Sequence, residues 1–401
     1  MHIPFEIWAS PEPTVARIDT ATYRDQLHET GHDVRDSDLD LLASLGISTT
    51  RYPVLWEKAS PDSPAQLDLA WATRRLERLR ELGIEPVVTL LHHGSGPRWT
   101  SLVDPAFPEQ FAAYAGAVAA AFPWIRRWTP INEPLTTARF ATLYGAWYPN
   151  TVGDDAAFGA AIVNEALGML LAMEAIRKRV AHAEFVVTED LQSFTSLHRA
   201  VDGLVAHKRS RMFLSIELTM GRVRPGHELY TYLTRTCGVS RARLARIVAH
   251  ACSPDLIGWN YYPNSERVVS KNVDGTVMNE PLGLHGTVSA LPLLRAAHER
   301  LMLPFGISEA HVHGDPDSRV AWFEARAADL LELASEDRPV CMLGAWAAFG
   351  LVDWDSLLVR SDEHHEDGVF TFAGRNGIPR ETALTACVRR YAAAARAAAA
   401  A

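Results

Sequence analysis

The chain has 401 residues, of which 48% are hydrophobic and 22% charged, and its formal net charge is −9. This composition is typical of a globular protein with a large core, and the acidic balance favours neither nucleic acid nor an anionic membrane as a partner. The N-terminus has no basic region before an apolar stretch, no run of about 18 apolar residues follows, and the four cysteines form no Cys-x-x-Cys pair. A cytoplasmic protein without a disulfide framework or zinc site is therefore expected.

Short runs typical of β-strands alternate with longer helical patterns along the chain. The predicted strands are residues 5–9, 48–54, 85–91, 125–131, 184–189, 256–260, 304–309 and 341–346. The predicted helices are residues 38–45, 67–82, 108–121, 156–180, 244–251, 289–301, 319–335 and 379–395. Gly46 and Gly83 follow the first two helices as expected C-caps. Eight strand–helix units predict an α/β fold of the (β/α)₈ TIM-barrel class.

The barrel is expected to form one domain over residues 1–391. The Ala-rich end, residues 392–401, is predicted to be a C-terminal helix or tail. Residues 191–250 are the least regular part of the sequence, and we expect them to form an insertion over the barrel mouth.

Two glutamates follow strand-like runs in short motifs. Glu133 lies in Thr-Pro-Ile-Asn-Glu-Pro, and Glu309 lies in Phe-Gly-Ile-Ser-Glu-Ala. (β/α)₈ barrels carry their active sites at the C-terminal ends of the strands, and two carboxylates presented there suit cleavage of a glycosidic bond. Burial and a neighbouring carboxylate raise the pKa of a glutamate, which suits Glu133 as proton donor. Glu309 as nucleophile needs a cation or several donors, which Arg51 and Tyr262 could supply.

Other interpretations of these residues stay open. Either glutamate alone would more often be a helix-terminal or surface residue, and the pairing gives the hypothesis its weight. Aromatic rings pack against the apolar faces of sugars. Tryptophans near the predicted strand ends are therefore platform candidates, although most tryptophans belong to the core: Trp56, Trp99, Trp259, Trp346 and Trp354.

Histidine clusters are the main argument for a metal site instead. They are His92-His93, His311-x-His313 and His364-His365. Neighbouring histidines on a continuing strand point to opposite faces, so His92 and His93 cannot both face the pore if the strand continues, whereas His311 and His313 could share a face. A metal-dependent hydrolase barrel would need a further His pair after the first strand, where this chain has Ser10-Pro11-Glu12.

Several segments, in their order along the chain, resemble glycoside hydrolase family 1, the retaining β-glucosidase type, over nearly the whole length. These segments are Arg51-Tyr52-Pro53 with Trp56, the run 84–92 ending at His92, Trp128 to Pro134, Ile257 to Tyr262, and Ile307-Ser308-Glu309-Ala310. An ordered set of this kind is far more specific than any one member.

The resemblance implies a role for each matching residue. Glu133 is the expected acid/base and Glu309 the expected nucleophile, with Arg51 and Tyr262 holding Glu309 ionised and aimed. Asn132 is expected to bind the sugar 2-hydroxyl, His92 a neighbouring hydroxyl, and Trp346 the face of the ring. Two carboxyl groups about 5 Å apart would imply retention through a covalent glycosyl-enzyme, without metal or cofactor.

The chain also departs from the family pattern at the sugar pocket. Asp353, followed by Trp354, stands where the family has a glutamate that grips two sugar hydroxyls. The family's first-strand glutamine is absent, and Glu12 is the candidate replacement. His93 stands where the family has an aromatic residue. Glu12, Asp353 and Trp354 are therefore predicted to be substrate-binding residues in an altered pocket.

The predicted function is a retaining β-glycosidase that hydrolyses a small glycoside or oligosaccharide by double displacement. The alternatives are a transglycosidase with the same residues, a sugar-binding pseudoenzyme on the same barrel, and the metal-dependent hydrolase. The sequence does not identify the sugar, the aglycone, the O-, S- or N-glycosidic linkage or the oligomeric state, because hydroxyl recognition depends on sub-ångström geometry.

Overall fold

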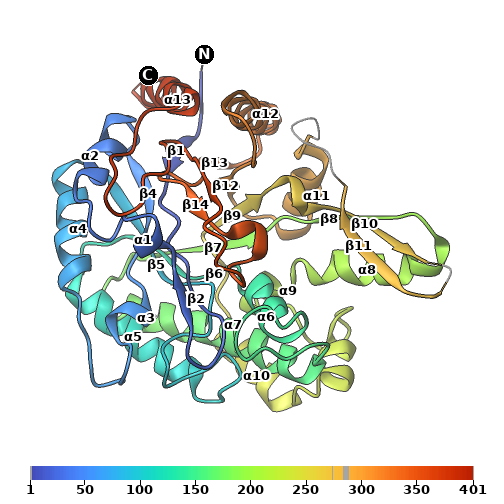
Figure 1. Ribbon diagram of the computed structural model, residues 1–401. Helices are drawn as coiled ribbons and strands as arrows, with labels where there is room; N and C mark the ends of the chain where they lie inside the picture. The colour runs from blue at the N-terminus through green and yellow to red at the C-terminus, as the bar shows by residue number, and fades with distance from the viewer. Residues whose placement is uncertain (1, 273, 283–288, 401) are drawn as a thin grey trace.

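The computed structural model describes residues 2–272, 274–282 and 289–400 and contains a closed parallel barrel (Figure 1). The barrel order is β1, β13, β12, β9, β7, β6, β5 and β4, and β4 closes it against β1. The bounds are β1 Glu6–Ala9, β4 Thr49–Pro53, β5 Glu85–His92, β6 Arg127–Asn132, β7 Glu184–Asp190, β9 Leu256–Tyr261, β12 Phe305–Ala310 and β13 Val340–Ala345. The predicted (β/α)₈ barrel is confirmed, and each predicted strand is present within two residues of its expected bounds.

The predicted helices are present with shifted ends. They are α2 Ser37–Ser44, α4 Ala70–Glu81, α5 Phe107–Ala121, α7 Asp155–Arg177, α10 Arg241–Ala249, α11 Leu291–Leu301, α12 Pro316–Ser335 and α13 Ala383–Ala399. Gly46 and Gly83 have φ of 73° and 71°, the left-handed conformation expected just after α2 and α4. The last helix begins at Ala383 and not at 379, because the Thr382 side chain accepts the N–H groups of Leu384 and Thr385 and caps it there.

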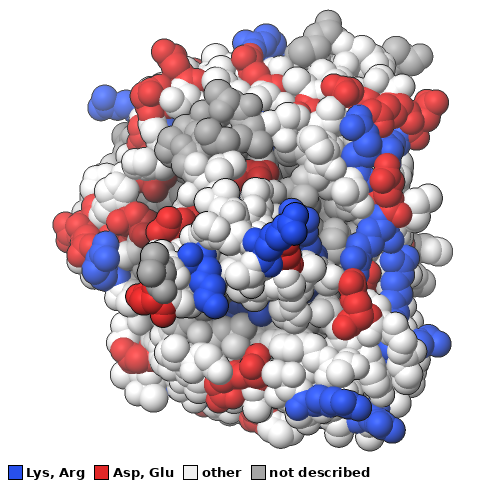
Figure 2. Space-filling model, turned by 90° about the vertical axis from the view of Figure 1, so that its right-hand side faces the viewer, with Lys and Arg blue, Asp and Glu red and all other residues white. Residues whose placement is uncertain are grey.

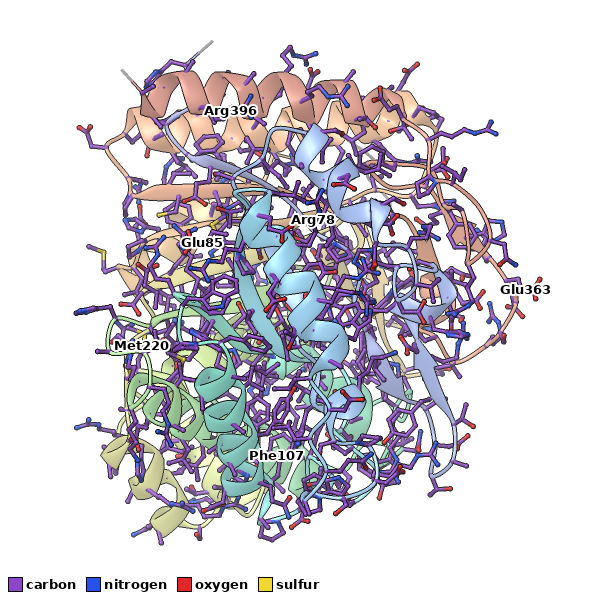
Figure 3. All side chains as sticks on the ribbon, turned by 90° about the vertical axis from the view of Figure 1, so that its left-hand side faces the viewer. Arg78, Glu85, Phe107, Met220, Glu363 and Arg396 are labelled. Atoms are coloured by element: carbon purple, nitrogen blue, oxygen red, sulfur yellow. The ribbon has the colours of Figure 1, made fainter. Side chains whose placement is uncertain are left out.

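Helices cover the outside of the barrel. Figure 3 shows α4 with Arg78 and α5 beginning at Phe107 on one side, and α13 with Arg396 running beside α12. Residues Ala392 to Ala399 continue α13. The long helix α7 is apolar enough for a membrane span, but 78% of its most apolar window is buried against the rest of the protein. Its packing against α5 and α6 (Pro134–Thr142) accounts for that apolar character.

The barrel interior is closed at the N-terminal end. Trp8, Val87, Val186 and Met342 form one buried cluster although they come from strands that are not all neighbours, so they meet across the interior. Arg127 on β6 donates to both carboxylate oxygens of Glu6 on β1, each at 2.8 Å, and bridges the same region. Barrels of this class carry their sites at the C-terminal ends of the strands, and these contacts fill the other end of the interior.

Short elements decorate the C-terminal ends of the strands. Those that follow β1, β4 and β6 are β2 Val15–Arg17, β3 Tyr23–Asp25, α1 Gln26–Glu29, α3 Trp56–Ala59 and α6. Those that follow β7 and β9 are β8 Ser193–Ser196, α8 Asp202–Arg211, α9 Leu214–Thr219, β10 Glu266–Lys271 and β11 Val277–Pro281. The pair β14 Leu351–Val352 and β15 His365–Glu366 follows β13. The short 3-10 and π turns are Arg199–Val201, Tyr232–Thr236, Pro263–Ser265 and Trp354–Ser356.

The predicted insertion is built jointly by two segments. β8, from residues 191–250, pairs in parallel with β10, which lies beyond β9 in the chain, and β10 pairs with β11. With α8 this small sheet extends from the side of the barrel in Figure 1. Figure 2 looks onto that side, where acidic and basic side chains are interspersed.

We expect Gly344→Ala to destabilise the protein by about 1–3 kcal/mol, the usual cost of overpacking a core. A Cβ on Gly344 in β13 would lie 2.1 Å from the backbone oxygen of Ser308 in β12, and backbone atoms have little room to move. The free energy of unfolding from urea titrations measures the loss. Gly203→Ala in α8 is the control, since its Cβ meets no atom within 4 Å, and should change stability by at most about 1 kcal/mol. Equal stability of the two variants would contradict the close approach of β12 and β13.

Candidate active site

A cavity of about 490 Å³ opens at the C-terminal ends of the barrel strands. Of the predicted site residues, Glu12, Glu133, Tyr262, Glu309, Trp346 and Trp354 line it. A second cavity, of about 770 Å³, lies at the opposite end between the strand starts and α13. We assign no chemistry to the second cavity, because Glu6 and Arg127 in its wall already pair with each other and barrels of this class react at the other end.

Glu133 joins β6 to α6. Its backbone is left-handed, with φ of 45°, and Pro134 follows at the first position of the helix. The strained residue is held because its N–H donates to Thr188 O at 3.0 Å and its own carbonyl accepts from Thr137 N at 2.9 Å. This turn presents the Glu133 side chain to the cavity.

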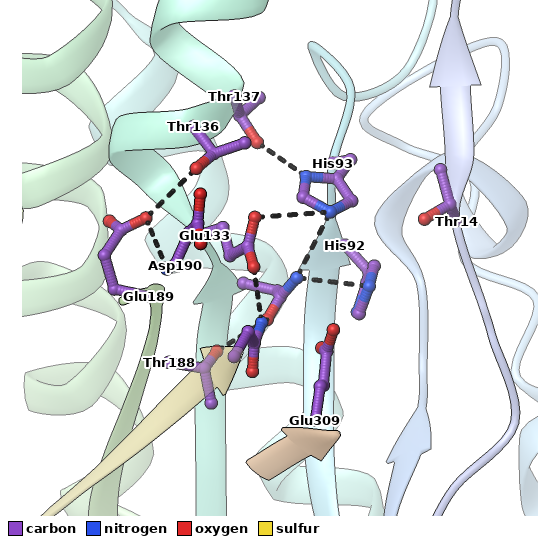
Figure 4. A network of polar contacts seen from close by, with 12 residues as sticks. Thr14, His92, His93, Glu133, Thr136, Thr137, Thr188, Glu189, Asp190 and Glu309 are labelled. Carbon is purple, nitrogen blue, oxygen red and sulfur yellow. Dashed lines mark hydrogen bonds and ion pairs between the residues drawn. The ribbon is translucent and has the colours of Figure 1, made fainter. Parts of the chain in front are cut away.

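The Glu133 carboxyl is in a setting that favours its protonated form. Burial raises its pKa well above the usual range, and the charges of Asp190, Glu309 and Glu189 raise it further. The Asn260 amide donates to its Oε1 at 2.6 Å, and among the described residues the nearest basic group, His93 Nε2, is 3.9 Å from its Oε2 (Figure 4). Burial lowers the pKa of His93 to about 3, so this ring carries no charge at neutral pH.

The Glu309 carboxyl, in contrast, accepts hydrogen bonds from two donors, one of which is a cation. Arg51 Nη2 donates to its Oε1 and the Tyr262 hydroxyl donates to its Oε2. Burial and the Glu309 charge raise the pKa of Tyr262 well above 10, so the hydroxyl keeps the proton that it donates. The β12 strand shifts register against β9 between Ile307 and Glu309, and such a bulge re-aims the side chain that follows it. Ser308 then reaches Asn260 at 2.6 Å while Glu309 reaches the cavity.

The Asn132 amide organises the histidines beside the pair. Its Oδ1 accepts from Arg51 Nη1 at 2.8 Å and from Thr188 Oγ1 at 2.7 Å, which leaves Nδ2 facing His92 Nε2 at 3.1 Å. His92 Nε2 must therefore accept, so the ring is neutral with its proton on Nδ1, in agreement with burial lowering the pKa of His92 well below 6.5.

The two neighbouring histidine rings pack against each other, and the ring of His93 lines the cavity. The strand β5 ends at His92, and His93 turns out of it with φ of 58°. The expectation that the two rings point to opposite faces holds only for a continuing strand, so it does not apply here. The two rings lie 4.9 Å apart, edge to face, and His93 lines the cavity. His92, Asn132 and Arg51 contact its wall residues but do not line it themselves, and their binding of substrate stays a prediction.

Glu12, the candidate replacement for the family's first-strand glutamine, lines the cavity. Its side chain is buried, Oε1 accepts the N–H of Thr14 at 2.8 Å, and Oε2 accepts the indole N–H of Trp346 at 3.2 Å. Trp346 in turn stacks on His92, with ring centres 5.7 Å apart. The structure therefore brings Glu12, Trp346 and Glu309 together in one wall.

The structure does not bring Asp353 to the cavity wall. Its Oδ2 accepts from Arg24 Nη2 at 2.8 Å and its Oδ1 from the backbone N–H of His364 at 2.8 Å. Burial would raise the pKa of Asp353, but these donors outweigh it and hold the pKa below the usual value. Trp354, the next residue, does line the cavity. Of the other candidate platforms, Trp56 and Trp259 lie in the core, and Trp99 packs on Trp56.

Several wall residues are not among the predicted catalytic or substrate-binding residues, although the histidines were weighed as metal ligands: His93, Asp190, His311, His313, Asp355, His364 and Glu366. Asp190 is the last residue of β7, so its place at a strand end could have indicated it. His311 and His313 both contact Glu366 Oε2, at 2.9 and 3.2 Å, so they do share a side. Glu366 comes from a segment with no strand-end signal in the sequence.

One described group has three ligating atoms within 4.8 Å of one another, formed by Glu217, His227 and Glu228. It does not line the cavity, and Arg300 already binds Glu217 and Glu228 there. The predicted histidine clusters are not gathered into such a group among the described residues.

The fold and the carboxyl pair define a class of protein, the (β/α)₈ barrels of the glycoside-hydrolase type. The model of glycosyl hydrolase family 1 matches residues 14–287. This match covers more than half of the chain, which therefore belongs to glycosyl hydrolase family 1, and the resemblance seen in the sequence is confirmed.

Curated relatives match parts of the chain, and solved structures share its fold. Putative beta-glucosidase 17 of Oryza sativa subsp. japonica is 28% identical over 121 residues, 28% of this chain and 40% of that protein. Klotho of Homo sapiens is 30% identical over 125 residues, 29% of this chain and 12% of that protein. The matched segments thus span less than half of these relatives. A beta-glucosidase from Thermotoga maritima in complex with cyclophellitol superimposes with a TM-score of 0.80 over 99% of this chain and 98% of that one, at 16% identity.

Glu133→Gln should stabilise the protein at pH 8 by about 1–3 kcal/mol, the usual cost of a poorly satisfied buried polar group, and should have little effect at pH 4. The folded-state pKa lies above the ordinary 4.5. As pH rises past 4.5 the unfolded chain loses this proton while the folded chain keeps it, so the wild type loses stability that the glutamine variant retains. Urea unfolding at the two pH values measures the difference. A pH-independent difference between the proteins would contradict the assignment.

Proposed function

We propose that this protein is a retaining β-glycosidase. One observation carries the proposal: two carboxyl groups line the same cavity in opposite electrostatic settings. Arg51 and Tyr262 donate to Glu309, whereas burial and neighbouring charges favour the proton on Glu133. Hydrogen-bond donors on one carboxyl and a raised pKa on the other suit the roles of nucleophile and general acid, respectively.

The proposed reaction has two steps. In the first, a Glu309 oxygen bonds to the anomeric carbon, the glycosidic bond breaks, and Glu133 gives its proton to the leaving oxygen. In the second, Glu133 takes a proton from water, the water oxygen bonds to the anomeric carbon, and Glu309 is released. Each step inverts the anomeric carbon, so the product retains the configuration of the substrate.

The wall and the comparisons support a sugar as the ligand. Trp346 and Trp354 offer flat apolar faces beside the carboxyl groups, which suit the C–H faces of a sugar ring. The superimposed Thermotoga maritima beta-glucosidase is also known in complex with glucoimidazole, with a TM-score of 0.79. A glycoside of the β-glucoside type is accordingly the proposed substrate class. A cytoplasmic setting is proposed with it, supported by four free cysteines.

A sugar-binding protein without turnover is the second candidate. The observation that favours it is the engagement of Asp353 by Arg24, which takes away a carboxylate that the family uses to grip the sugar. A weaker grip on the sugar would cost transition-state stabilisation as well as affinity. Covalent trapping separates the two candidates.

Incubation with 2-deoxy-2-fluoro-β-glucosyl fluoride should add one fluoroglucosyl group to the protein, on the peptide that contains Glu309. The electron-withdrawing fluorine slows the second step, so the glycosyl-enzyme accumulates. Glu309→Gln should not be labelled, and its kcat on nitrophenyl β-glycosides should fall by at least about 10⁴-fold. Intact-mass and peptide mass spectrometry measure the label.

Glu81→Gln, at an exposed residue at the end of α4 on the outside of the barrel, is the control and should be labelled like the wild type. Labelling of the Glu309 variant at the same rate, or absence of any label together with sugar binding, would refute the hydrolase proposal. NMR of the first product should show the β-anomer, and added alcohols would reveal any transglycosylation.

Glu133→Gln should lower kcat/KM for an alkyl β-glucoside by about 10²–10⁴-fold but affect a dinitrophenyl β-glucoside far less. The dinitrophenolate leaves without a proton, so the first step no longer needs the acid. Azide should then restore turnover of the dinitrophenyl substrate and yield the β-glycosyl azide, because azide needs no general base. Steady-state kinetics on both substrates measure the effect. Equal losses on the two substrates would remove Glu133 from the acid/base role.

A further inference from the structure

The cavity wall carries an excess of acidic side chains. The described lining residues include six carboxyl groups and no Lys or Arg. Most of these carboxyl groups have a basic partner: Glu309 has Arg51, Glu366 has His311 and His313, Asp355 has His364 at 3.3 Å, and Asp190 has Arg139 at 4.0 Å. Glu133, the proposed acid, keeps its own proton. Glu12 is the remaining one.

Glu12 has donors but no cation in contact. The backbone N–H of Thr14 and the indole N–H of Trp346 are both neutral donors, and each carboxylate oxygen can accept more than one hydrogen bond. The nearest basic group is His92 Nε2, 3.7 Å from Oε1, and that nitrogen accepts from Asn132 and carries no proton. Arg51 is engaged by Glu309 and Asn132.

The position of Glu12 is constrained by its own sequence. It lies between Pro11 and Pro13, whose rings restrict the backbone on both sides. The side chain is buried, with 3% of its surface exposed, and it lines the cavity. A buried carboxyl in a fixed position, with free acceptor capacity and no countercharge, is suited to a ligand that brings the charge.

We propose that Glu12 makes the sugar subsite selective for an amino sugar, whose ammonium group supplies the missing countercharge. This inference rests on the proposed glycosidase function and names its substrate class. A neutral hydroxyl would satisfy the hydrogen bonds of Glu12 but would leave its charge uncompensated beside Glu309. Because Glu12 bonds to the indole edge of Trp346, the amino group belongs on the rim of the sugar ring and not on the anomeric carbon.

Electrostatics near neutral pH are consistent with this role. Burial raises the pKa of Glu12 to about 7, and the charge of Glu309 adds to the rise, while Thr14 and Arg51 oppose it. A bound ammonium group would favour the ionised form, so part of the Glu12 population should release a proton on binding. The other titratable groups facing Glu12 are Glu309, Arg51, His92 and Tyr262.

The test compares nitrophenyl β-glucoside with its 2-, 3-, 4- and 6-amino-deoxy analogues at pH 7. In the wild type, we expect one amino analogue to exceed the parent glucoside in kcat/KM by about 10- to 100-fold, the usual range for a charge-assisted hydrogen bond. Glu12→Gln keeps the shape and removes the charge, and should abolish that ratio. Asp355→Asn is the matched control, since His364 and Arg360 already compensate Asp355, and should keep the ratio.

A binding experiment separates this inference from the proposed hydrolysis. Calorimetry of the Glu133→Gln variant with the methyl β-glycosides, in buffers of different ionisation enthalpy, should show tighter binding of one amino sugar and release of a proton. Adding Glu12→Gln should remove both signals, with thermal unfolding as the folding control. Preferred binding without turnover would support Glu12 selectivity while the hydrolase proposal fails. Turnover without amino preference, or equal losses on both sugars in Glu12→Gln, would overturn the inference while the hydrolase proposal stands.

Discussion

The buried ion pair of Arg51 and Glu309 is the interaction on which the rest of the site depends. It joins β4 and β12, which are not neighbours in the barrel, and the same guanidinium binds Asn132 on β6. A buried charge without a partner costs several kcal/mol, so each end of the pair requires the other. The Arg51 contact also orients the Asn132 amide, which in turn makes His92 neutral. One cation thus determines the hydrogen-bonding roles of three neighbouring residues.

Irregular backbone at the barrel mouth supplies the geometry that regular strands cannot. Glu133, His93 and Asp353 are all left-handed, and β12 shifts register just before Glu309. Such conformations cost roughly 1–3 kcal/mol each and persist where surrounding contacts over-determine them. Below them the apolar cluster around Trp8 and Met342 fills the barrel interior and gives the mouth a rigid base. At Glu133 and His93 the strained backbone belongs to residues whose side chains line the cavity.

Two departures from the family pattern, at Asp353 and Glu12, both involve the connection that follows β1. Arg24, from the hairpin after the first barrel strand, engages Asp353. Glu12 lies at the start of the same connection and keeps free acceptor capacity. Asp353 is thus held outside the cavity wall by Arg24, whereas Glu12 lines the wall. For the proposed glycosidase, this change would alter the sugar subsite, while Glu133 and Glu309 both line the same cavity.

Residue patterns alone predicted the eight strand–helix units, the glycines that end α2 and α4, and the two glutamates at strand ends, because periodicity, capping and motifs are local properties. The contacts of Arg51 and Tyr262 with Glu309 also followed from strand order once the barrel was assumed. Three features could be learned only from the folded chain: His93 and Glu366 line the cavity, Asp353 does not, and Glu12 contacts no cation among the described residues. These features depend on contacts between residues far apart in the chain, such as Arg24 with Asp353, and on backbone turns that those contacts stabilise.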